Sequence, residues 1–356
     1  MHLAYSLRPY GHHALAASQS DIEETATSFE ALTRQAAQAE EAGFDLVVID
    51  DVATGPSDAE LSNDLAAFEP TTLIAALATK VEQIGFIGSA STMDHAPYNL
   101  ARRFASLDNS SGGRVGWNVV AASVDQERDV EYVGLVKSLW DSWEEDAFIY
   151  DKKAARFFVP EKMHVLNHEG ANFSVRGPLN VNRSPQGRPI ISAVLSPGSV
   201  DIAARFADVV FVRETSVASA HAVANEFSER LGHYGRGRND VRIFQSVIAY
   251  LGNTTEAARA YHYSLNQGSV GDTPAEAVVG TASEVADRIS SLMDGLTFDG
   301  VEFLQPVVPE KDFLLFDFAA ALRDRLGPAN VTQGTLREFL GLKRPDFPAT
   351  QQEEIR

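Results

Sequence analysis

The fold is decided by residues 81–120, which read VEQIGFIGSA STMDHAPYNL ARRFASLDNS SGGRVGWNVV. Residues 83–89 form a short apolar run, residues 97–107 carry apolar side chains at helical spacing after a proline, and residues 114–120 form a second apolar run. A strand, a helix and a strand in this order form a βαβ unit, whose two strands are parallel. The stretch therefore predicts an α/β protein.

The same alternation continues on both sides of this unit without a linker. Eight strands are expected, at residues 2–7, 44–49, 83–89, 114–120, 189–194, 208–212, 241–251 and 300–304. Helices are expected between and after them, at residues 27–43, 70–80, 97–107, 130–143, 197–206, 219–232, 256–265, 282–295 and 312–327. We therefore predict a (β/α)8 TIM barrel over residues 1–327, as one domain.

Two segments depart from the repeat. Residues 150–189 show neither helical nor strand periodicity and contain Gly, Pro and Asn, so we expect a long excursion inside the barrel sequence. Residues 328–356 follow the last helix as a C-terminal tail, of which residues 336–340 are expected to pack back onto the barrel.

The composition is that of an acidic globular protein, with 356 residues, 44% hydrophobic and 22% charged, and a formal net charge of −19 at pH 7. Nucleic acids and anionic membranes are bound largely through Lys and Arg, so this charge argues against both as partners. It does not argue against a small anionic ligand, because backbone N–H groups at a helix N-terminus can hold a phosphate.

The sequence contains no cysteine, which excludes disulfides, thiolate metal sites and cysteine nucleophiles and fits a reducing compartment. No basic segment followed by an apolar stretch of about 7–15 residues begins the chain, and no run reaches the roughly 20 apolar residues of a membrane helix. We expect a cytoplasmic protein.

Barrel enzymes bind their ligands on the loops after the carboxyl ends of the strands. Asp51 follows the second strand and could accept hydrogen bonds from a ligand, although a helix-capping role and the neighbouring Asp50 are alternatives. Ser89 ends the third strand among small residues that let a flat ligand approach. Asn118 lies in the fourth strand, where its amide needs either a structural partner or a ligand.

Three further candidates follow other strands. Ser196 precedes Pro197, which is typical of a helix N-cap, and the same N-terminus could also bind a phosphate. His13, beside His12, and His95 are candidate catalytic acid–base residues, or else ordinary loop histidines.

No metal site is predicted. His164 and His168 have a spacing that suits a metal on a helix, but they lie in the non-helical excursion and lack a third ligand. P-loop and Rossmann fingerprints in a strand–turn–helix context are missing, and so is the G-x-S-x-G turn of a serine hydrolase.

The motifs taken together resemble one group of bacterial luciferase-like flavin-dependent monooxygenases, those of nitrilotriacetate, dibenzothiophene sulfone and pristinamycin. The resemblance rests on co-linear stretches across the chain. They are Gly11-His12-His13, residues 97–108, Ser111-Gly112-Gly113-Arg114, Gly116-Trp117-Asn118-Val119-Val120, Leu139-Trp140-Asp141-Ser142-Trp143, Asn167-His168-Glu169-Gly170, residues 173–178, residues 183–189 and Thr335-Leu336-Arg337-Glu338.

The resemblance implies a two-component enzyme that uses O2 and reduced FMN supplied by a separate flavin reductase, with the cofactor carrying the oxygen chemistry. It implies a small substrate that is oxidised at carbon next to nitrogen or sulfur. Carried over by position, flavin contacts fall on Asp51, Ser89 and Asn118, and the phosphate-binding serine falls on Ser196.

Other functions stay open. Between the fourth strand and the next helix, residues 121–130 lack the histidine and tyrosine that the family supplies there, and Val194 and Leu195 replace small residues before the phosphate serine. The alternatives are a cofactor-free enzyme, a binding or regulatory subunit, and a deazaflavin-dependent oxidoreductase. Luciferase-like barrels often form dimers, so a homodimer is also left open.

Overall fold

The computed structural model describes residues 1–51, 67–121, 125–266, 275–293, 297–310, 312–327 and 334–348. Eight parallel strands form a barrel, in the order β1-β2-β3-β4-β9-β10-β11-β13, which the β10–β11 and β13–β1 pairings close. The strands are β1 (His2–Ser6), β2 (Leu46–Ile49), β3 (Gly85–Ser91), β4 (Val115–Val120), β9 (Ile190–Val194), β10 (Val209–Val212), β11 (Arg242–Leu251) and β13 (Gly300–Leu304). The predicted barrel is confirmed.

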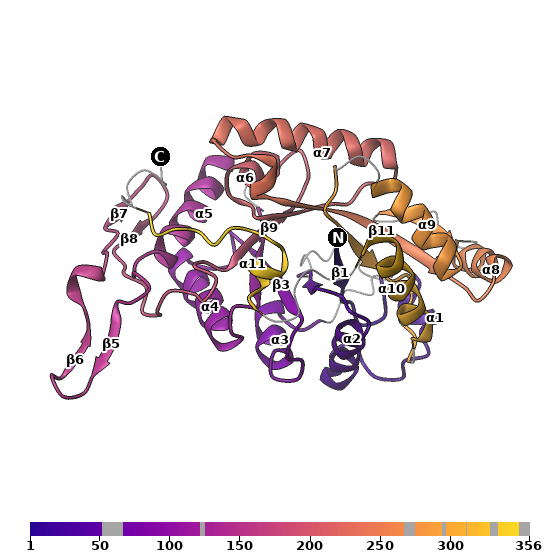
Figure 1. The fold of residues 1–356 in the computed structure, drawn as a ribbon, viewed down its shortest axis with the longest axis horizontal. Helices are drawn as coiled ribbons and strands as arrows, with labels where there is room; N and C mark the ends of the chain where they lie inside the picture. Colours follow the sequence, from indigo (N-terminus) through magenta and orange to yellow (C-terminus); the bar gives the residue numbers. More distant parts are fainter. Residues whose placement is uncertain are drawn as a thin grey trace.

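Helices surround the barrel (Figure 1). They are α1 (Ala16–Gln19), α2 (Phe29–Glu41), α3 (Pro70–Leu77), α4 (Pro97–Ser110), α5 (Gln126–Trp140), α6 (Val200–Phe206), α7 (Val217–Leu231), α8 (Thr255–Asn266), α9 (Ala282–Met293), α10 (Phe313–Leu326) and α11 (Leu336–Phe339), with short 3-10 helices at Pro160–Lys162, Gly232–Tyr234 and Arg238–Asp240. Within the described ranges, no helix is both long and apolar enough to cross a membrane.

Helix boundaries follow the caps more closely than the apolar pattern. The fourth predicted helix was placed at residues 130–143, but α5 begins at Gln126, because the Asp125 carboxylate accepts the backbone N–H groups of Glu127 and Arg128. Its polar first turn carries no apolar signal. Glu69 caps α3 in the same way, ahead of a proline at the first helical position.

The structure adds a strand that the sequence pattern did not predict. β12 (Glu276–Gly280) pairs in parallel with the second half of β11, from Val247 to Leu251. The first half of β11 pairs with β10 and β13 inside the barrel wall. β11 is therefore long enough to extend past the barrel rim, and β12 covers that extension.

The barrel interior is apolar toward the amino ends of the strands. One cluster of buried side chains fills it, and the C-terminal tail contributes to this cluster Leu336 of α11 and Leu340, which follows that helix. Both leucines are fully buried. The tail thus closes this end of the barrel with its own side chains.

A network of buried hydrogen bonds around Asp108 holds the tail in place. Asp108 on α4 accepts hydrogen bonds from the Val115 N–H (3.0 Å), the Gln186 side chain (2.7 Å) and the Ser184 hydroxyl. Gln186 in turn accepts the backbone N–H of Arg337 at 2.9 Å. Burial raises the pKa of Asp108 to about 6, so its three donors offset a real desolvation cost.

The excursion contains two small hairpins where the sequence showed no periodicity. β5 (Phe148–Asp151) pairs with β6 (Arg156–Phe158), and β7 (His168–Glu169) pairs with β8 (Ser174–Val175), all antiparallel. Strands of two to four residues are too short for a periodic signal. The β5–β6 hairpin projects away from the barrel (Figure 1).

We predict that Leu336→Ala lowers the free energy of unfolding by about 2–5 kcal/mol, because it leaves a cavity in the barrel interior. Urea denaturation measures the change. Phe313→Ala is the control, since Phe313 is 75% exposed and its loss should cost within about 0.5 kcal/mol. Equal losses in the two variants would contradict a closing role for α11.

Candidate functional site at the carboxyl ends of the strands

Polar side chains line the barrel interior toward the carboxyl ends of the strands, the end here called the mouth. Ser89, Asn118 and Ser192 lie at the same level on the neighbouring strands β3, β4 and β9. Ser192 Oγ donates to Asn118 Oδ1 (3.2 Å), Asn118 Nδ2 donates to Ser89 Oγ (2.8 Å), and Ser89 Oγ lies 3.4 Å from Asp50 Oδ1. The donors all run in one direction, toward Asp50.

Arg213, directly after β10, connects this row of hydrogen bonds to a second carboxylate. Its Nη1 donates to Asp50 Oδ2 at 2.7 Å, while Nε and Nη2 donate to the two oxygens of Glu302 at 3.0 and 2.6 Å. Ser246 on β11 also donates to Glu302. One guanidinium therefore bridges the walls formed by β2, β10 and β13.

The charges at this mouth are interdependent. Glu302 is fully buried. Burial acts to raise the pKa of Asp50, but the Arg213 guanidinium outweighs it, and the net shift is downward. Burial likewise acts against the Arg213 cation, while Asp50 and Glu302 raise its pKa above the ordinary arginine value. The mouth thus holds an ionised carboxylate beside a fixed cation.

Two further groups line the mouth beside β1. The Ser6 hydroxyl is buried, shares the interior face with Ala4 and has no hydrogen-bond partner within the described ranges. His12 lies with Nε2 at 3.1 Å from the Ser6 carbonyl oxygen, and burial, with Arg8 nearby, lowers its pKa to about 3. The imidazole is therefore neutral, and the free Ser6 hydroxyl is available to a ligand.

The residues present fit a flat ring with alternating donors and acceptors, such as the isoalloxazine of a flavin. Ser6 Oγ is an orphaned donor and acceptor, and the second N–H of the Asn118 amide has no other recorded acceptor among the described residues. These residues could hold the polar edge of such a ring.

The structure brings together only some of the predicted cofactor residues. Ser89 and Asn118 are hydrogen-bonded to each other, whereas Asp51 is exposed at the end of the described segment after β2. Side chains alternate along a strand, so Asp50 shares the interior face with Val48 and Asp51 does not. Asp50, the competitor, is the residue in the network; a flavin contact of Asp51 stays a prediction.

Ser196 does not cap a helix, so that expectation is wrong. The expected helix at residues 197–206 begins instead at Val200, with Ser199 at the cap position. Ser199 Oγ accepts the Ser196 N–H (2.9 Å) and donates to the Val194 carbonyl (2.7 Å), which closes a turn ahead of the helix. Ser196 is exposed on this turn, and a Cβ at Gly198 would meet open space. An anion can therefore reach the turn.

Val194 and Leu195 do not block that turn. Val194 packs against the barrel-interior cluster, and Leu195 is buried in the core between the strands and the helices. Their bulk is accommodated on the two faces of the sheet, away from the Ser196 hydroxyl.

The two candidate catalytic histidines lie in different surroundings. His13 is buried on the loop after β1, where its Nδ1 accepts the Leu15 N–H (3.1 Å) and burial lowers its pKa. His95 lies beside Arg103 of α4 at 3.2 Å and lines a groove of about 980 Å³ along α3 and α4. The structure does not bring them together, and their catalytic roles stay predictions.

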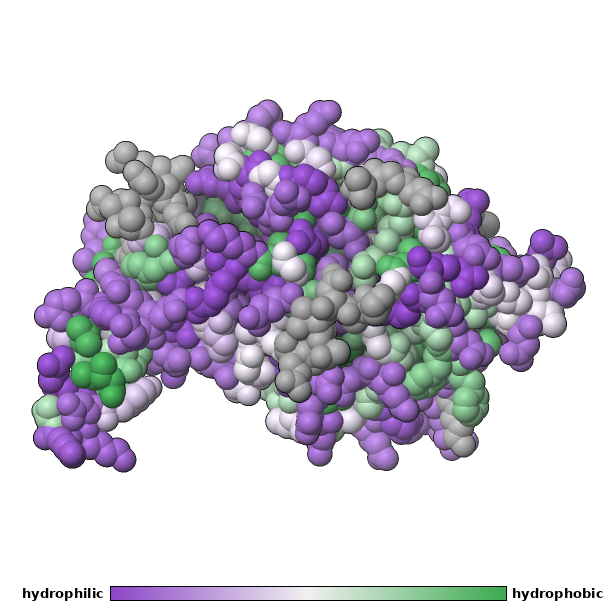
Figure 2. Space-filling view, in the orientation of Figure 1, coloured by the Kyte–Doolittle hydropathy of each residue, from purple (hydrophilic) through white to green (hydrophobic). Residues whose placement is uncertain are grey.

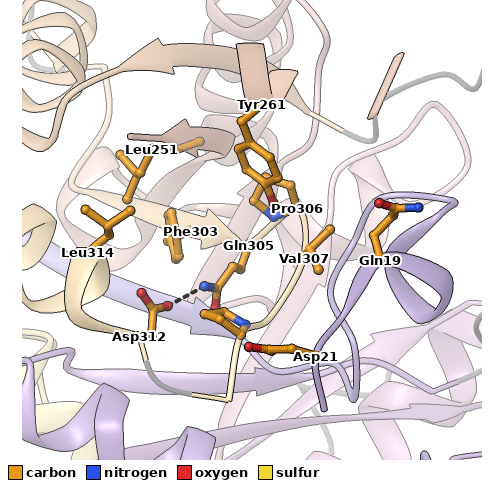
Figure 3. Close-up of a pocket in the computed structure, with 12 residues that line it drawn as sticks. Gln19, Asp21, Leu251, Tyr261, Phe303, Gln305, Pro306, Val307, Asp312 and Leu314 are labelled. Carbon is orange, nitrogen blue, oxygen red and sulfur yellow. Dashed lines mark hydrogen bonds between the residues drawn. The ribbon is translucent and has the colours of Figure 1, made fainter. Parts of the chain in front are cut away.

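A separate cavity of about 380 Å³ opens beside the mouth (Figure 3). Gln305 and Asp312 face each other across it through a hydrogen bond, and Tyr261 of α8 and Phe303 contribute aromatic walls. The segment after β13 separates this cavity from the loop that carries His12 and His13, whose N–H groups bond to Gln305 and Pro306 carbonyls. It is large enough for a small ligand.

Sequence reasoning missed Arg213, Glu302, Ser192 and Ser246. Glu302 carried a signal, because a carboxylate in the middle of the apolar run at residues 300–304 must find a buried partner. Arg213 is the residue directly after its strand, where the strand-end rule applies. No group of three or more His, Asp or Glu side chains within the described residues could hold a metal.

The comparisons with known proteins agree on one family. The family model described as luciferase-like monooxygenase matches residues 9–289. N-acetyl-S-(2-succino)cysteine monooxygenase of Bacillus subtilis (strain 168) is 32% identical, over 94% of this chain and 95% of that protein. Nitrilotriacetate monooxygenase component A of Aminobacter aminovorans is 30% identical, over 78% of this chain and 79% of that protein.

Solved structures show the same fold. EDTA monooxygenase from Chelativorans sp. BNC1 has a TM-score of 0.82 at 23% identity, covering 98% of this chain and 100% of that one. A riboflavin lyase structure with modified FMN and riboflavin has a TM-score of 0.82 at 22% identity, covering 97% and 96%.

We predict that Arg213→Gln destabilises the protein by about 3–5 kcal/mol near pH 7, because it leaves the buried Glu302 carboxylate and the half-buried Asp50 carboxylate without their cation. In the wild type Asp50 has a lowered pKa, so its contribution to stability is lost as pH falls. Without Arg213, burial becomes the largest influence on that pKa and acts to raise it, while Arg8 and His12 oppose it less strongly than Arg213 did, so the deficit of the variant shrinks as pH falls toward about 5.

Urea denaturation across this pH range measures both effects. Arg230→Gln is the control, because Arg230 forms its ion pairs with Asp201 and Glu226 on exposed helices. A deficit of Arg213→Gln that is small, or constant with pH, would contradict the bridging role.

Proposed function

Because the chain belongs to the luciferase-like monooxygenase family, we propose that it is a two-component monooxygenase that uses reduced FMN and O2 to oxidise a small organic substrate. The observation that carries the proposal is the polar chain from Ser192 through Asn118 and Ser89 to Asp50 at the barrel mouth. Ligand sites of this fold lie at that end.

In this proposal the mouth holds the flavin ring. Asn118 and Ser6 offer hydrogen bonds to its polar edge, and Asp50 with Arg213 fixes the orientation of the Ser89–Asn118 pair. When bound, reduced FMN supplies two electrons to O2, so that one oxygen atom enters the substrate and the other leaves as water. The described residues position the ring and limit the access of water.

The open turn at residues 196–198 supports a phosphate site. Ser196 offers an exposed hydroxyl, and the neighbouring residues leave room beside Gly198. A charged acceptor strengthens such hydrogen bonds. The protein's net charge of −19 does not oppose this, since a local hydroxyl donor acts at short range.

The substrate class follows from the relatives. Those named above act on a sulfur-substituted cysteine derivative and on nitrilotriacetate, an amine, according to their names. We propose oxidation at carbon next to sulfur or nitrogen. Component A implies a further component in the nitrilotriacetate system, and a separate flavin reductase is the proposed partner here.

One observation favours a second candidate, a barrel that works without flavin as a cofactor-free enzyme or a regulatory subunit. Only residues 121–125 separate β4 from α5. The alignment with the Bacillus relative is 419 positions long, more than the 356 residues of this chain, so that relative has residues where this chain has none. A shorter wall around the mouth would weaken flavin binding.

Titration of the purified protein with reduced FMN in the absence of oxygen decides between the two. Saturable binding at micromolar FMN, followed by O2-dependent reoxidation whose time course differs from that of free reduced FMN, supports the monooxygenase. The absence of binding in this range would exclude it and leave the cofactor-free candidate.

Asn118→Ala should weaken the binding of reduced FMN by about tenfold, because a net hydrogen bond is worth about 1 kcal/mol and Ser89 also loses its partner. Asn99→Ala is the control, since Asn99 is exposed on α4. Equal affinities of the two variants would place the ring away from Asn118.

Ser196→Ala should weaken FMN by the worth of a hydrogen bond to a charged group, about 1.5–3 kcal/mol, and leave the affinity for riboflavin unchanged. Anaerobic titrations with both flavins measure the difference. A loss that is the same for FMN and riboflavin would show that Ser196 does not act on the phosphate.

A further inference from the structure

The cavity of about 380 Å³ beside the mouth lies on the outer side of the barrel wall (Figure 3). Side chains alternate along β13, and Glu302 faces the barrel interior, where it binds Arg213. The next residue, Phe303, faces outward, with its ring 4.9 Å from the Phe318 ring of α10, centroid to centroid. Phe303 lines the cavity. The backbone of β13 therefore separates the cavity from the polar side chains of the mouth.

The walls of the cavity are apolar and partly aromatic. β11 contributes Ala249 and Leu251, β13 contributes Phe303, and the helices α8 and α10 contribute Tyr261 and Leu314. The Tyr261 and Phe303 rings border the same space (Figure 3). Aromatic faces attract organic cations, and a cavity of this size is typical of small-ligand sites.

Gln305 and Asp312 form a buried polar part of this lining, with 7% and 6% of their surfaces exposed. The Gln305 amide nitrogen donates to Asp312, and its amide oxygen accepts the Tyr5 hydroxyl at 2.9 Å. Tyr5 is itself buried in the wall. Both ends of the amide are thus held, and they fix the position of the Asp312 carboxylate.

Asp312 is a buried carboxylate that has hydrogen-bond donors but no cation. Its Oδ1 accepts the Leu315 N–H at 2.9 Å, as the cap of α10. Burial raises the pKa of Asp312, and the groups among the described residues that oppose this shift are hydrogen-bond donors, none of them charged. The desolvation of this carboxylate is therefore only partly offset.

Other buried carboxylates of the chain have a cation beside them. Glu302 pairs with Arg213, and Asp141 pairs with Arg188. Buried charges in proteins are normally paired in this way, because an unpaired charge is costly. The open space beside Asp312 is the cavity, so a cation that enters the cavity can form the corresponding pair.

The carboxylate faces an aromatic wall across this space. Burial raises the pKa of the Tyr261 hydroxyl, and the nearby Tyr250 and Asp312 add to the shift. Asp312 and Tyr261 therefore lie close enough to interact with one bound molecule.

The entrance of the cavity also favours cations. Its edge includes Gln19 of α1 and Asp21, both exposed, and the lining contains no Lys, Arg or His among the residues that the structure describes. The sequence holds 49 acidic against 30 basic residues, and most of the molecular face in Figure 2 is hydrophilic. An excess of negative charge raises the local concentration of cations.

We propose that this cavity binds a small organic ammonium ion that carries an aromatic group. The ammonium group pairs with Asp312, and the aromatic group lies against Phe303, Tyr261 and the aliphatic walls. An anion would meet carboxylates without a cation, and a neutral molecule would leave Asp312 without a charged partner.

The ammonium ion is a ligand at a second site, separate from the proposed reaction. Because the backbone of β13 lies between the cavity and the mouth, a molecule bound beside Asp312 is not placed next to a flavin ring in the mouth. The proposal therefore does not depend on flavin binding, and it is tested on the flavin-free protein.

Isothermal titration calorimetry with three probes of similar shape tests the charge preference. Phenethylamine is a cation near pH 7, phenethyl alcohol is neutral, and hydrocinnamate is an anion. The amine should bind about tenfold or more tightly than the alcohol, since a hydrogen bond to a charged group is the stronger one. Hydrocinnamate should not bind.

Asp312→Asn tests the carboxylate, because an asparagine side chain can still cap α10 but carries no charge. The affinity for phenethylamine should fall about tenfold or more, to that of the alcohol. Asp317→Asn is the matched control, since Asp317 is exposed on the same helix and does not line the cavity. Leu314→Phe narrows the cavity and should weaken both probes, and it locates the site if Asp312→Asn fails to fold.

A lack of phenethylamine binding in the millimolar range would overturn the proposal. So would equal affinities for the amine and the alcohol, or an amine affinity that Asp312→Asn and Leu314→Phe leave unchanged. A protein that binds the amine in this way but does not bind reduced FMN would keep this site and reject the proposed function.

Discussion

The barrel mouth depends on the position of Arg213 between Asp50 and Glu302. Glu302 is fully buried, and a buried carboxylate without a cation would cost several kcal/mol. With Arg213 in place, Asp50 stays ionised and accepts from Ser89, which accepts from the Asn118 amide. The ion pairs of Arg213 therefore set the direction of the hydrogen bonds from Asn118 through Ser89 to Asp50, and they leave one N–H of the Asn118 amide for a ligand.

The opposite end of the barrel holds several of the residues that carry the family resemblance. A network of buried hydrogen bonds holds the C-terminal tail there. It joins Asp108, Gln186 and Arg337, which come from three of the co-linear stretches. Gly113, at φ +88°, lets Thr335 approach so closely that a Cβ there would lie 2.7 Å from the threonine methyl group. Much of the sequence signature thus specifies barrel closure, and it reports the family without reporting the substrate.

The sequence predicted the barrel because each wall strand is a continuous apolar run between helices. Since these runs also mark where the strands end, Ser89 and Asn118 could be identified as residues near the carboxyl ends of their strands. It did not separate Asp50 from Asp51. All four residues of β2 are buried, so hydropathy shows no alternation, and only the pairing of Val48 with Ile87 inside the barrel shows which aspartate faces inward. The partners of Glu302 come from strands distant in sequence. β12 is only partly buried and lacks the continuous apolar run of the wall strands, and the strands of the β5–β6 hairpin are too short to show a period.

The β5–β6 hairpin and the mouth are separate features of the protein. The hairpin is inserted between α5 and β9, and its Phe148 and Phe158 rings pack on Trp143 outside the barrel wall. The network around Arg213 involves β2, β3, β4, β9, β10, β11 and β13, none of which contributes to the hairpin. A change in the hairpin should therefore leave the geometry of the mouth unchanged, since no hydrogen bond of the network passes through Trp143 or its ring contacts.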